Sequence, residues 1–577
     1  MAFNNGIYAP NVGGASYYLG TQASPINVTY GLKYTPCTWF MFYDPSSSLY
    51  VCRNGANSSV AGQAVYTNSD FATLLNTLLA QTTYPIGTVH VAAGNYTLSK
   101  TILLPNQTPC VIEGEGWGGT LSGVNYGTNF NFNASQGRAF GDNNNTSQTS
   151  VYWTSLKNFK LTNTDSGTSD GQSYGIDIGY GANAYELLVD HVEAQACAIS
   201  LNGSPPASGG YACYNSVVQN CYVHDIINTG IDRGLSCLGK HNTLCNNTVQ
   251  NVTVMGIAFL GVSNNLCSHN HVINWGQSAA GSAAIDCAQN SNSVVIGNEI
   301  LGNSTAGGGA TGILIEGATG NIDILGNTLN SVPGNSIQVW QNGAGNNPPA
   351  SINVNSNNIS SGGGIGIMFN DCLSAVCSGN TLNVCNNGGI SVSLTTQSQI
   401  KHIDCNHNNL YGCSTGSGNP FSLGVGPNVD YVDWDHNYID CQSLSGSLGM
   451  GYHDSMPYSS ITNNTVINAV FSDYYDFSKS GRYAPATCKL FSHNYPINPV
   501  AISSVTAGTS PYSFAALPFD AVYVITTVGG MTALKLNTQA LFNGSFSVGQ
   551  NVFVGANNTL QATWATTAPV FEIVPQN

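Results

Sequence analysis

A short element, Asn followed by any residue and then an aliphatic residue, recurs throughout the middle of this 577-residue chain. It appears in GNTLNSV, SNNISSG and HNNLYGC, and successive copies lie 23 to 30 residues apart, with a mean of about 27. Such variable spacing excludes a coiled coil, which needs regular heptads, and suits a solenoid whose coils carry loops of different length. The recurring residues are Asn247, Asn270, Asn298, Asn327, Asn357, Asn380, Asn408, Asn437 and Asn464.

A second element lies between these Asn residues and centres on an isoleucine, as in YGIDIG, TGILIE and IGIMFN. Each repeat therefore holds two or three short alternating strands broken by Gly or Asn, and it shows no helical period. Repeats of this kind stack into a parallel β-helix, in which each coil is hydrogen-bonded to the next at about 4.8 Å. The central isoleucines are Ile176, Ile199, Ile231, Ile257, Ile285, Ile313, Ile337, Ile367 and Ile390.

The recurring Asn has a structural role in such a stack. At a tight bend Asn tolerates left-handed backbone angles, and its amide can bond to the Asn of the coils above and below. We therefore expect an Asn ladder along one corner of the coils, with Asn327 and Asn357 as vertical neighbours. Residues three positions before the ladder should face the interior, where Cys377 and Cys405 lie on adjacent coils, either as a disulfide or as stacked thiols.

The segment before the repeats combines a helix with three strands. SDFATLLNTLLAQ has a helical pattern, and GTVHVAAGNYTLSKTILLPNQTPCVIEGEG gives the strands. This order resembles the N-terminal part of pectate-lyase-like right-handed β-helices, including viral tailspike proteins, in which a short amphipathic helix caps the first coil. The resemblance covers roughly residues 65 to 480 and implies an all-β fold, a right-handed parallel β-helix with a short capping helix at its N-terminal end. We place this domain at residues 63–498, because the Asn ladder stops at about residue 498.

A smaller domain is expected on either side of the solenoid. Residues 1–62 include CTWFMFYDPSSSLYVC, which predicts a β-hairpin closed by a disulfide between Cys37 and Cys52 in an N-terminal attachment region. Residues 499–577 lack the Asn ladder and show short strands with turn signals, as in an antiparallel β-sandwich. This part resembles the terminal domains of tail fibres and spikes, and because solenoids need capped ends we expect it to cap or to oligomerise.

Charge and cysteine content narrow the class of protein. Only 7% of the residues are charged and the net charge is −15, with no basic run, which excludes tight nucleic-acid binding. No apolar stretch reaches the roughly 18 residues that span a membrane, and MAFNNGIYAPNVGG has neither the basic start nor the apolar core of a signal peptide. Seventeen cysteines nevertheless favour an oxidising compartment, so we expect an extracellular or virion-surface protein.

One outward face of the predicted β-helix carries candidate catalytic residues. The residue after each central isoleucine should point outward, which places Asp232 and Asp286 two coils apart, about 9.6 Å, with Glu316 beside Asp286. Carboxylates about 6.5–9.5 Å apart perform inverting glycoside hydrolysis, one as acid and one as base. The opposing interpretation is that scattered acids only keep a long sheet soluble. The residues of this face predicted to bind glycan are Asp177, Gln338, Trp340 and Asn370.

A rival cluster lies on another face of the coils. KHIDCNHNNL and YVDWDHNYID have matching register and bring carboxylates and imidazoles together, a group that can hold a metal or share protons. Its spacing matches no metal motif, so no cofactor is expected, and a structural Ca²⁺ ion has no motif to support it. Solvated turn residues are the alternative interpretation. The members of this cluster are Asp404, Asp433, Asp435, His407 and His436.

The sequence favours a glycan-binding protein, similar to a tailspike or an adhesin, whose partner is a polysaccharide or a glycosylated cell surface. We expect a homo-oligomer, and the resemblance to spikes favours a trimer. A polysaccharide-cleaving hydrolase or lyase using Asp232, Asp286 and Glu316 is the alternative, although the GHG and RIK motifs of polygalacturonases are missing. A structural fibre or surface-layer subunit is a third interpretation, and whether the chain is an enzyme stays open.

Overall fold

The computed structural model describes most of the chain as short β-strands. The chain forms two compact units, residues 1–313 (unit 1) and residues 314–577 (unit 2), and the boundary falls within strand β30 (Thr311–Glu316). The structure describes residues 38–54, 65–81, 86–105, 109–117, 120–121, 124–125, 127–133, 138–142, 151–164, 174–179, 183–201, 213–226, 233–260, 263–276, 282–288, 292–302, 310–317, 320–340, 351–370, 372–393, 402–413, 421–425, 431–452, 458–470, 472–476, 490–495, 502–517 and 520–575.

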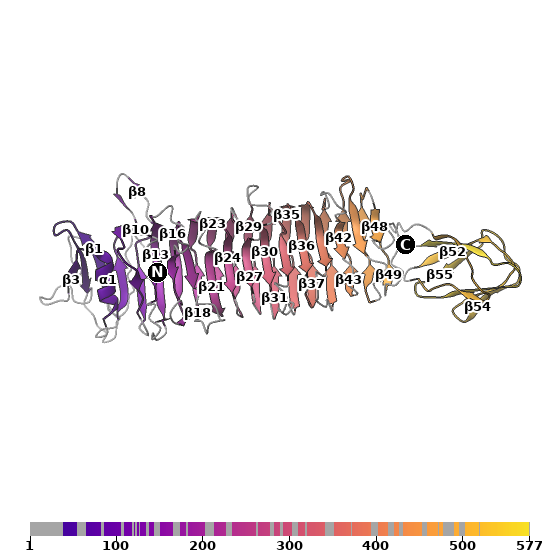
Figure 1. Ribbon diagram of the computed structural model, residues 1–577, viewed down its shortest axis with the longest axis horizontal. Coiled ribbons are helices and arrows are strands. Elements are labelled where there is room, and N and C mark those ends of the chain that lie inside the picture. Colours follow the sequence, from indigo (N-terminus) through magenta and orange to yellow (C-terminus); the bar gives the residue numbers. More distant parts are fainter. Residues whose placement is uncertain are drawn as a thin grey trace, which may run out of the picture. The chain divides into compact units, whose positions relative to one another are not determined.

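Unit 1 contains coils of a right-handed parallel β-helix, the fold class that the repeat and the resemblance predict. Each strand pairs in parallel with the strand at the same place in the next coil, so that strands of successive coils lie side by side (Figure 1). The strands of these coils are β4 (Gly87–Val91), β5 (Gly94–Thr97), β6 (Ile102–Leu103), β7 (Cys110–Glu113), β10 (Thr128–Phe132), β11 (Arg138–Gly141), β12 (Val151–Tyr152), β13 (Thr154–Asn163), β14 (Tyr174–Asp177), β15 (Ala184–Tyr185), β16 (Leu188–Gln195), β17 (Ala198–Leu201), β18 (Cys213–Tyr214), β19 (Val217–Gln219), β20 (Tyr222–Ile226), β21 (Arg233–Lys240), β22 (Thr243–Cys245), β23 (Thr248–Val252), β24 (Met255–Leu260), β25 (Leu266–Ser268), β26 (His271–Ile273), β27 (Ala283–Ala288), β28 (Ser293–Ile296) and β29 (Glu299–Leu301).

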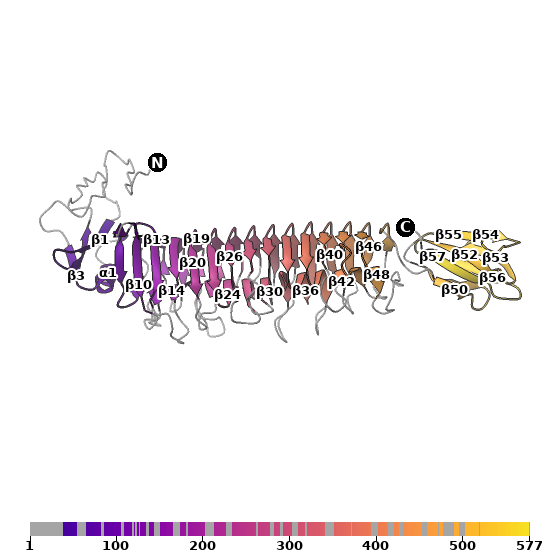
Figure 2. The same ribbon diagram turned by 90° about the horizontal axis from the view of Figure 1, so that it is seen from above.

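Unit 2 contains coils of the same kind, each with three strands that pair in parallel between coils, and the turned view in Figure 2 shows the same stacking. The strands of these coils are β31 (Asn321–Leu325), β32 (Thr328–Asn330), β33 (Ile337–Trp340), β34 (Ser351–Asn355), β35 (Asn358–Gly362), β36 (Ile365–Asn370), β37 (Ser374–Ser378), β38 (Thr381–Cys385), β39 (Gly388–Ser393), β40 (His402–Asn406), β41 (Asn409–Tyr411), β42 (Phe421–Val425), β43 (Val432–Asp435), β44 (Tyr438–Asp440), β45 (Leu448–Tyr452), β46 (Ser460–Thr462), β47 (Thr465–Ile467), β48 (Ser472–Asp476) and β49 (Leu490–Ser492).

The predicted Asn ladder is present in both units. In unit 2 the Nδ2 of Asn327 donates to the Oδ1 of Asn357 at 3.0 Å, which confirms that these two residues are vertical neighbours. In unit 1 the Nδ2 of Asn270 donates to the Oδ1 of Asn298, also at 3.0 Å. Because each ladder amide bonds to neighbouring coils, the ladder fixes the register in which one coil stacks on the next.

The left-handed backbone angle belongs to the residue before the ladder Asn, which corrects the sequence-based interpretation. His407, His436 and Asn463 occupy this position and have φ angles of 55°, 52° and 54°. The ladder residues themselves face the interior, where Asn408 and Asn437 are 0% and 1% exposed. The bend is therefore divided between two residues, one that accepts the strained angle and one that supplies the amide.

Apolar and sulfur side chains fill the interior of the coils. Val354, Cys377, Cys405 and Trp434 form one column in register, and all four are fully buried. None of the fifteen cysteines that the structure describes is disulfide-bonded, so Cys377 and Cys405 are stacked thiols. The contact with Cys377, followed by burial, raises the pKa of Cys405 well above its usual value, which keeps this thiol protonated and inert.

A hairpin and a helix precede the first coil, as predicted. Strands β1 (Thr38–Asp44) and β2 (Leu49–Asn54) pair antiparallel, and β3 (Val65–Asn68) adds to β2. Asp70 is the N-cap of helix α1 (Phe71–Leu79). Its side chain accepts a hydrogen bond from the backbone N–H of Thr73 and so caps the helix.

The predicted disulfide between Cys37 and Cys52 is not observed. The hairpin register places Met41 opposite Cys52, because the turn lies two residues later than a Cys37–Cys52 closure requires. Cys52 is a buried thiol, and burial raises its pKa to about 12. Cys37 lies outside the described residues. The sequence identified the hairpin correctly but not its register.

The C-terminal part of unit 2 changes from parallel to antiparallel pairing, as predicted for this region. Two four-stranded sheets form, and the domain boundaries predicted after residues 62 and 498 stay predictions. In sheet order, the strands are β50 (Ile502–Thr506), β57 (Val570–Pro575), β52 (Ala521–Thr527) and β55 (Asn551–Val554), and then β51 (Tyr512–Ser513), β56 (Leu560–Trp564), β53 (Met531–Leu536) and β54 (Gln539–Asn543).

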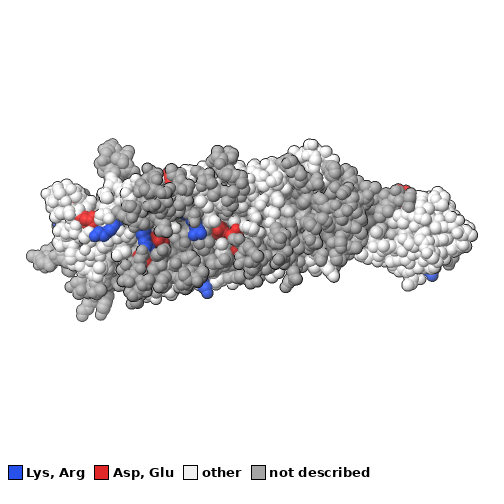
Figure 3. Space-filling model, in the orientation of Figure 1, with Lys and Arg blue, Asp and Glu red and all other residues white. Residues whose placement is uncertain are grey.

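Charged side chains are sparse on the surface. On the face drawn in Figure 3 most described atoms belong to uncharged residues, and the few basic and acidic side chains lie mainly in mixed groups. Among the described residues, no helix has the length and apolarity that a membrane crossing requires.

Candidate functional site

The register of the coils changes the predicted catalytic column. Ser200 of β17 pairs with Ser236 of β21, so Ser236 occupies the position predicted for Asp232. The segment TGIDRGLS contains two Gly-aliphatic pairs, at residues 230–231 and 234–235, and the second pair enters the stack. Asp232 itself lies outside the described residues.

The other two predicted catalytic residues lie in different units. Asp286 belongs to β27 of unit 1 and is 2% exposed, whereas Glu316 ends β30 in unit 2 and is half-buried. Asp286 is paired with Ala258 in a column that is buried rather than open, since Ser236 and Ala258 are 3% and 0% exposed. Because Asp232 lies outside the described residues, the inverting pair of Asp232 and Asp286 is not tested, and a catalytic role for Asp232, Asp286 and Glu316 stays a prediction.

Asp177, the first of the predicted glycan-binding residues, is part of a buried ion-pair cluster in unit 1. The Nη1 of Arg138 lies 3.3 Å from a carboxylate oxygen of Asp177 and 3.2 Å from one of Asp142. Burial raises the pKa of Asp177 to about 7; the guanidinium of Arg138 opposes this rise, and the carboxylate of Asp142 adds to it. The side chain is only 8% exposed, so it presents little surface to a ligand.

The remaining predicted glycan-binding residues lie in unit 2. Gln338 and Trp340 of β33 are half-buried, and Asn370 at the end of β36 is 4% exposed. Gln338 accepts a hydrogen bond from the Nδ2 of Asn335 at 3.0 Å. A glycan-binding role for these three residues stays a prediction.

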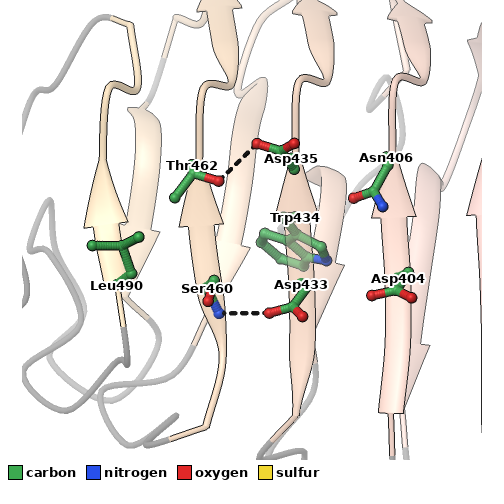
Figure 4. Close-up of a pocket in the computed structure, with 8 residues that line it drawn as sticks. All are labelled: Asp404, Asn406, Asp433, Trp434, Asp435, Ser460, Thr462 and Leu490. Atoms are coloured by element: carbon green, nitrogen blue, oxygen red, sulfur yellow. Dashed lines mark hydrogen bonds between the residues drawn. The ribbon is translucent and has the colours of Figure 1, made fainter.

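A hollow of about 340 Å³ lies in unit 2, on a different sheet from the one that contains β33 and β36 (Figure 4). The outward side chains of β40, β43, β46 and β49 form most of it, because alternation along each strand sends every second side chain outward. The register places Asp404 opposite Asp433, as predicted, and Asp433 opposite Ser460. The lining residues are Asp404, Asn406, Asp433, Trp434, Asp435, Ser460, Thr462 and Leu490.

An imidazole joins the two facing carboxylates. The Nε2 of His402 lies 2.9 Å from the Oδ1 of Asp404 and 3.2 Å from the Oδ2 of Asp433. Burial raises the pKa of Asp404; the charge of His402 opposes the rise, and that of Asp433 adds to it. The three donor atoms lie within 4.8 Å of one another, so the group has the dimensions of a metal-ligand set.

The third carboxylate of the hollow, Asp435, is fixed by its own hydrogen bonds. Its Oδ1 accepts from the hydroxyl of Thr462 at 2.7 Å and from the Nδ2 of Asn463 at 2.9 Å, and its Oδ2 lies 2.6 Å from the Nδ1 of His436. Burial alone would raise the pKa of Asp435, but the hydrogen bonds from Asn463, Thr462 and His436 outweigh it and lower the pKa. Asp435 is therefore a preformed carboxylate acceptor at the edge of the hollow.

The histidine next to the facing aspartates is His402, whereas the sequence-based cluster named His407 and His436. Those two residues lie at the left-handed turn position, where their rings stack at 5.0 Å with an interplanar angle of 2°. His436 contacts Asp435, but neither turn histidine belongs to the described three-residue metal-ligand group. The alternation of β40, which puts His402 and Asp404 on one face, was the sequence signal that would have identified His402.

An aromatic column borders the hollow. His402 packs edge-on against Tyr431 at 4.4 Å, and Tyr431 stacks on Tyr458 at 6.4 Å with an interplanar angle of 16°. Tyr458 is 58% exposed, so one phenol ring next to the acidic lining is open to solvent.

The chain is similar to several solved structures, each at low sequence identity. No protein-family model matches the chain, and no curated protein sequence matches it significantly. Among solved structures, an N-terminal fragment of gene product 12 of bacteriophage Phi29 is 14% identical, with 71% of this chain and 70% of that chain covered and a TM-score of 0.41. The surface adhesin PfbA of Streptococcus pneumoniae is 12% identical, with coverages of 63% and 94% and a TM-score of 0.37. The Dettilon tailspike protein is 10% identical, with coverages of 85% and 88% and a TM-score of 0.38.

Proposed function

We propose that this chain is a glycan-binding protein that acts outside the cell or on a virion surface, and that the acidic hollow of unit 2 is its saccharide site. The observation that carries the proposal is the combination of oxygen acceptors with an open aromatic ring: Asp433 and Asp435 line the hollow, and Tyr458 stands exposed beside it. Saccharide hydroxyls donate to carboxylate oxygens, and the C–H face of a sugar ring packs on an aromatic side chain.

The charge of the hollow favours a neutral glycan. Three of its eight lining residues are aspartates and none is basic. An anionic polysaccharide would bring further negative charge to within a few ångströms of these carboxylates, where repulsion amounts to about 1–4 kcal/mol per pair. A neutral saccharide avoids this cost and supplies the hydroxyl donors that the carboxylates accept.

Binding is proposed in preference to cleavage, because two of the predicted catalytic residues do not reach the hollow: Asp286 is 2% exposed in a buried column, and Glu316 does not line the hollow. The third, Asp232, lies outside the described residues. The hydrolase or lyase interpretation, and that of a purely structural fibre, therefore become outcomes of the same experiment.

The test is binding of the full chain to an array of neutral and uronic-acid-containing polysaccharides. We expect binding to members of the neutral class, and a loss of at least about tenfold in affinity on Asp433→Asn, because a charged hydrogen-bond acceptor is replaced by a neutral one. Reducing ends released from the bound polysaccharide would support the hydrolase instead, and failure to bind any glycan would support the structural fibre.

The matched control is Asp323→Asn. Asp323 belongs to the same outward column of the same sheet, since β31 pairs with β34, β34 with β37 and β37 with β40. Its carboxylate accepts a hydrogen bond from Asn353 and does not line the hollow. An equal loss of glycan affinity in both variants would overturn the assignment of the site.

A homotrimer stays part of the proposal, with the C-terminal sheets as the region that joins the copies. This region exposes large apolar side chains, among them Phe542 at 45%, Val548 at 67% and Phe553 at 59%. Light scattering of the purified chain should give three times its 60.3 kDa mass, and a chain ending at residue 498 should give a lower multiple. A monomeric full chain would contradict this part of the proposal.

A further inference from the structure

We infer that His402, Asp404 and Asp433 form a binding site for one divalent first-row transition-metal ion, with zinc as the representative. The site is defined by three side chains on two adjacent strands, β40 and β43, whose register places them on one face. The inference stands on these residues and does not require that the hollow bind glycan.

The donor atoms lie slightly closer together than a bound metal ion requires. Bonds of about 2.0–2.2 Å in a tetrahedral zinc site place neighbouring donors about 3.3–3.6 Å apart. In the structure the Nε2 of His402 lies 2.9 Å from the Oδ1 of Asp404 and 3.2 Å from the Oδ2 of Asp433. Outward movements of a few tenths of an ångström would admit the ion, and such movements are within the reach of side-chain rotations in half-buried residues.

The chemistry of the donor set selects the class of metal. One imidazole nitrogen and two carboxylate oxygens suit zinc, manganese and related ions, whereas calcium and magnesium prefer oxygen ligands alone. Two carboxylates also compensate the charge of a divalent ion. Three protein ligands leave at least one coordination position for water or for an added ligand.

Neighbouring groups hold the ligands in place. The backbone N–H of Ser460 donates to the Oδ1 of Asp433 at 3.1 Å, which leaves the Oδ2 of this carboxylate directed at His402. Tyr431 packs edge-on against the His402 ring and restricts its rotation. Outer contacts of this kind orient metal ligands and raise the affinity of a site.

A separate feature of the same hollow points to a bound ligand. The Oδ1 of Asn406 is buried and accepts no hydrogen bond from the protein, and Asn406 lies two residues beyond Asp404 on the same face of β40. A buried acceptor without a donor costs about 1–3 kcal/mol. A rotation of the Asn406 side chain that exposes this oxygen to the hollow would let a metal-bound water donate to it; a saccharide hydroxyl would do so as well, a step that rests on the proposed function.

The test is titration of the metal-free full chain with zinc chloride, followed by calorimetry and by measurement of bound metal. We expect one zinc ion per chain, and a loss of at least about 100-fold in affinity for His402→Gln and for Asp433→Asn, because losing a ligand exceeds the 10–100-fold cost of losing an outer contact. Asp323→Asn, the carboxylate of the same column, should bind zinc as the wild type does. With cobalt, the strong visible absorption of a tetrahedral site should appear in the wild type and be lost in His402→Gln, which lacks one of the three protein ligands.

Three results would overturn the inference: no zinc uptake by the wild type, equal uptake by His402→Gln, or uptake lost equally in Asp323→Asn. Zinc taken up by the buried thiols would persist in every variant and so falls under the second result. Circular dichroism identifies a variant that fails to fold, and the two ligand variants on separate strands serve as alternatives for each other. Zinc binding without glycan binding would support the metal site and contradict the proposed function. Glycan binding without zinc binding would support the proposed function and contradict the metal site.

Discussion

Glu193 in unit 1 and the pair Asp404 and Asp433 in unit 2 are outward carboxylates in opposite electrostatic surroundings. In unit 1, Glu193 lies 2.7 Å from the Nζ of Lys160 and 3.2 Å from the Nε2 of His224, so its charge is compensated by side chains of the same coils. In unit 2, Asp404 and Asp433 face each other across adjacent strands with only His402 between them. The backbone is the same parallel sheet in both cases, and the difference lies in which side chain the register places opposite each acid.

This contrast separates structural from functional charge. A carboxylate with a lysine partner is satisfied by the fold and stabilises it, whereas facing carboxylates repel each other and gain most from a ligand that brings positive charge or hydroxyl donors. Both units contain the Asn ladder, so the effect of a ladder substitution on stability provides the reference for comparing the two units.

The largest effect is expected from removing a ladder amide, and it should be equal in the two units. Asn437 donates to Asn464 and to the carbonyl of Cys405, and it accepts from Asn408. Truncating it to Ala strands several buried polar groups and should lower the free energy of unfolding by about 4 kcal/mol. Asn270→Ala in unit 1 should cost the same, as measured by chemical denaturation.

Asn330→Ala serves as the control for the ladder variants. Asn330 is an exposed residue of β32, and its loss should change the free energy of unfolding by less than about 0.5 kcal/mol. If a ladder variant lowered the free energy of unfolding no more than this control does, and did so in one unit only, the coils of the two units would not be stabilised in the same way.

The second largest effect concerns pH and the buried acids of unit 1. The pKa of Asp177 is about 7 in the folded chain against 3.8 for the free group, so the folded state holds this proton more tightly than the unfolded state does. The contribution of Asp177 to stability is therefore fully present below about pH 4 and is lost as the pH rises through 7. Between pH 5 and pH 8 the loss should be roughly 2–3 kcal/mol.

Asp177→Asn removes this dependence. Arg138 keeps its ion pair with Asp142, so the variant should fold and should lose less stability than the wild type between pH 5 and pH 8 in thermal unfolding. A wild type and a variant with the same pH profile would show that Asp177 is not held as a buried acid with a raised pKa.

Much of the fold was predictable from the sequence, because the ladder Asn recurs in successive coils from Asn247 onward and must stack to bond. The register of the coils was less predictable. TGIDRGLS offers two Gly-aliphatic pairs, and only pairing with the coil before it decides that Ser236 rather than Asp232 enters the column. The burial of Asp177 was also hidden, since its partner Arg138 lies 39 residues away in the sequence.

The candidate site was predicted in part. Two coils with matching register identified Asp404 and Asp433 as neighbours, because vertical neighbours follow from the repeat alone. His402 was not predicted, because the repeated pattern Asp-x-x-His at the turn pointed to His407 and His436. Strand alternation nevertheless puts His402 on the same face as Asp404. The aromatic border could not be predicted, since the exposure of Tyr458 depends on which neighbours leave its ring open.

A further pair of variants tests whether the two kinds of carboxylate contribute to the free energy of unfolding with opposite signs. Glu193→Gln should lower the free energy of unfolding by about 1 kcal/mol, because Lys160 loses this carboxylate and the buried His224 keeps only the carboxylate of Asp225. Asp404→Asn should raise it by about 0.5 kcal/mol in metal-free buffer, because it removes the repulsion with Asp433. Both are measured by chemical denaturation, and effects of the same sign would remove the distinction drawn between the two faces.

Two tyrosines extend the same contrast to aromatic side chains, and the smallest effect on stability is expected from the exposed one, Tyr458. In unit 1, Tyr185 is stacked between Tyr152 and Tyr214 at 4.8 and 4.9 Å, so both of its faces are occupied by protein. Tyr185→Ala should therefore cost about 1 kcal/mol of stability and leave glycan affinity unchanged.

Tyr458→Ala should do the reverse, because Tyr458 is 58% exposed and packs only distantly on Tyr431. Its free energy of unfolding should stay within about 0.5 kcal/mol of the wild type, while affinity for the neutral glycan falls by roughly 2- to 10-fold and zinc affinity is retained. The glycan array, zinc calorimetry and chemical denaturation together separate the two residues. If Tyr185→Ala weakened glycan binding and Tyr458→Ala did not, the recognition surface would belong to unit 1, and the acidic hollow would be a metal site alone.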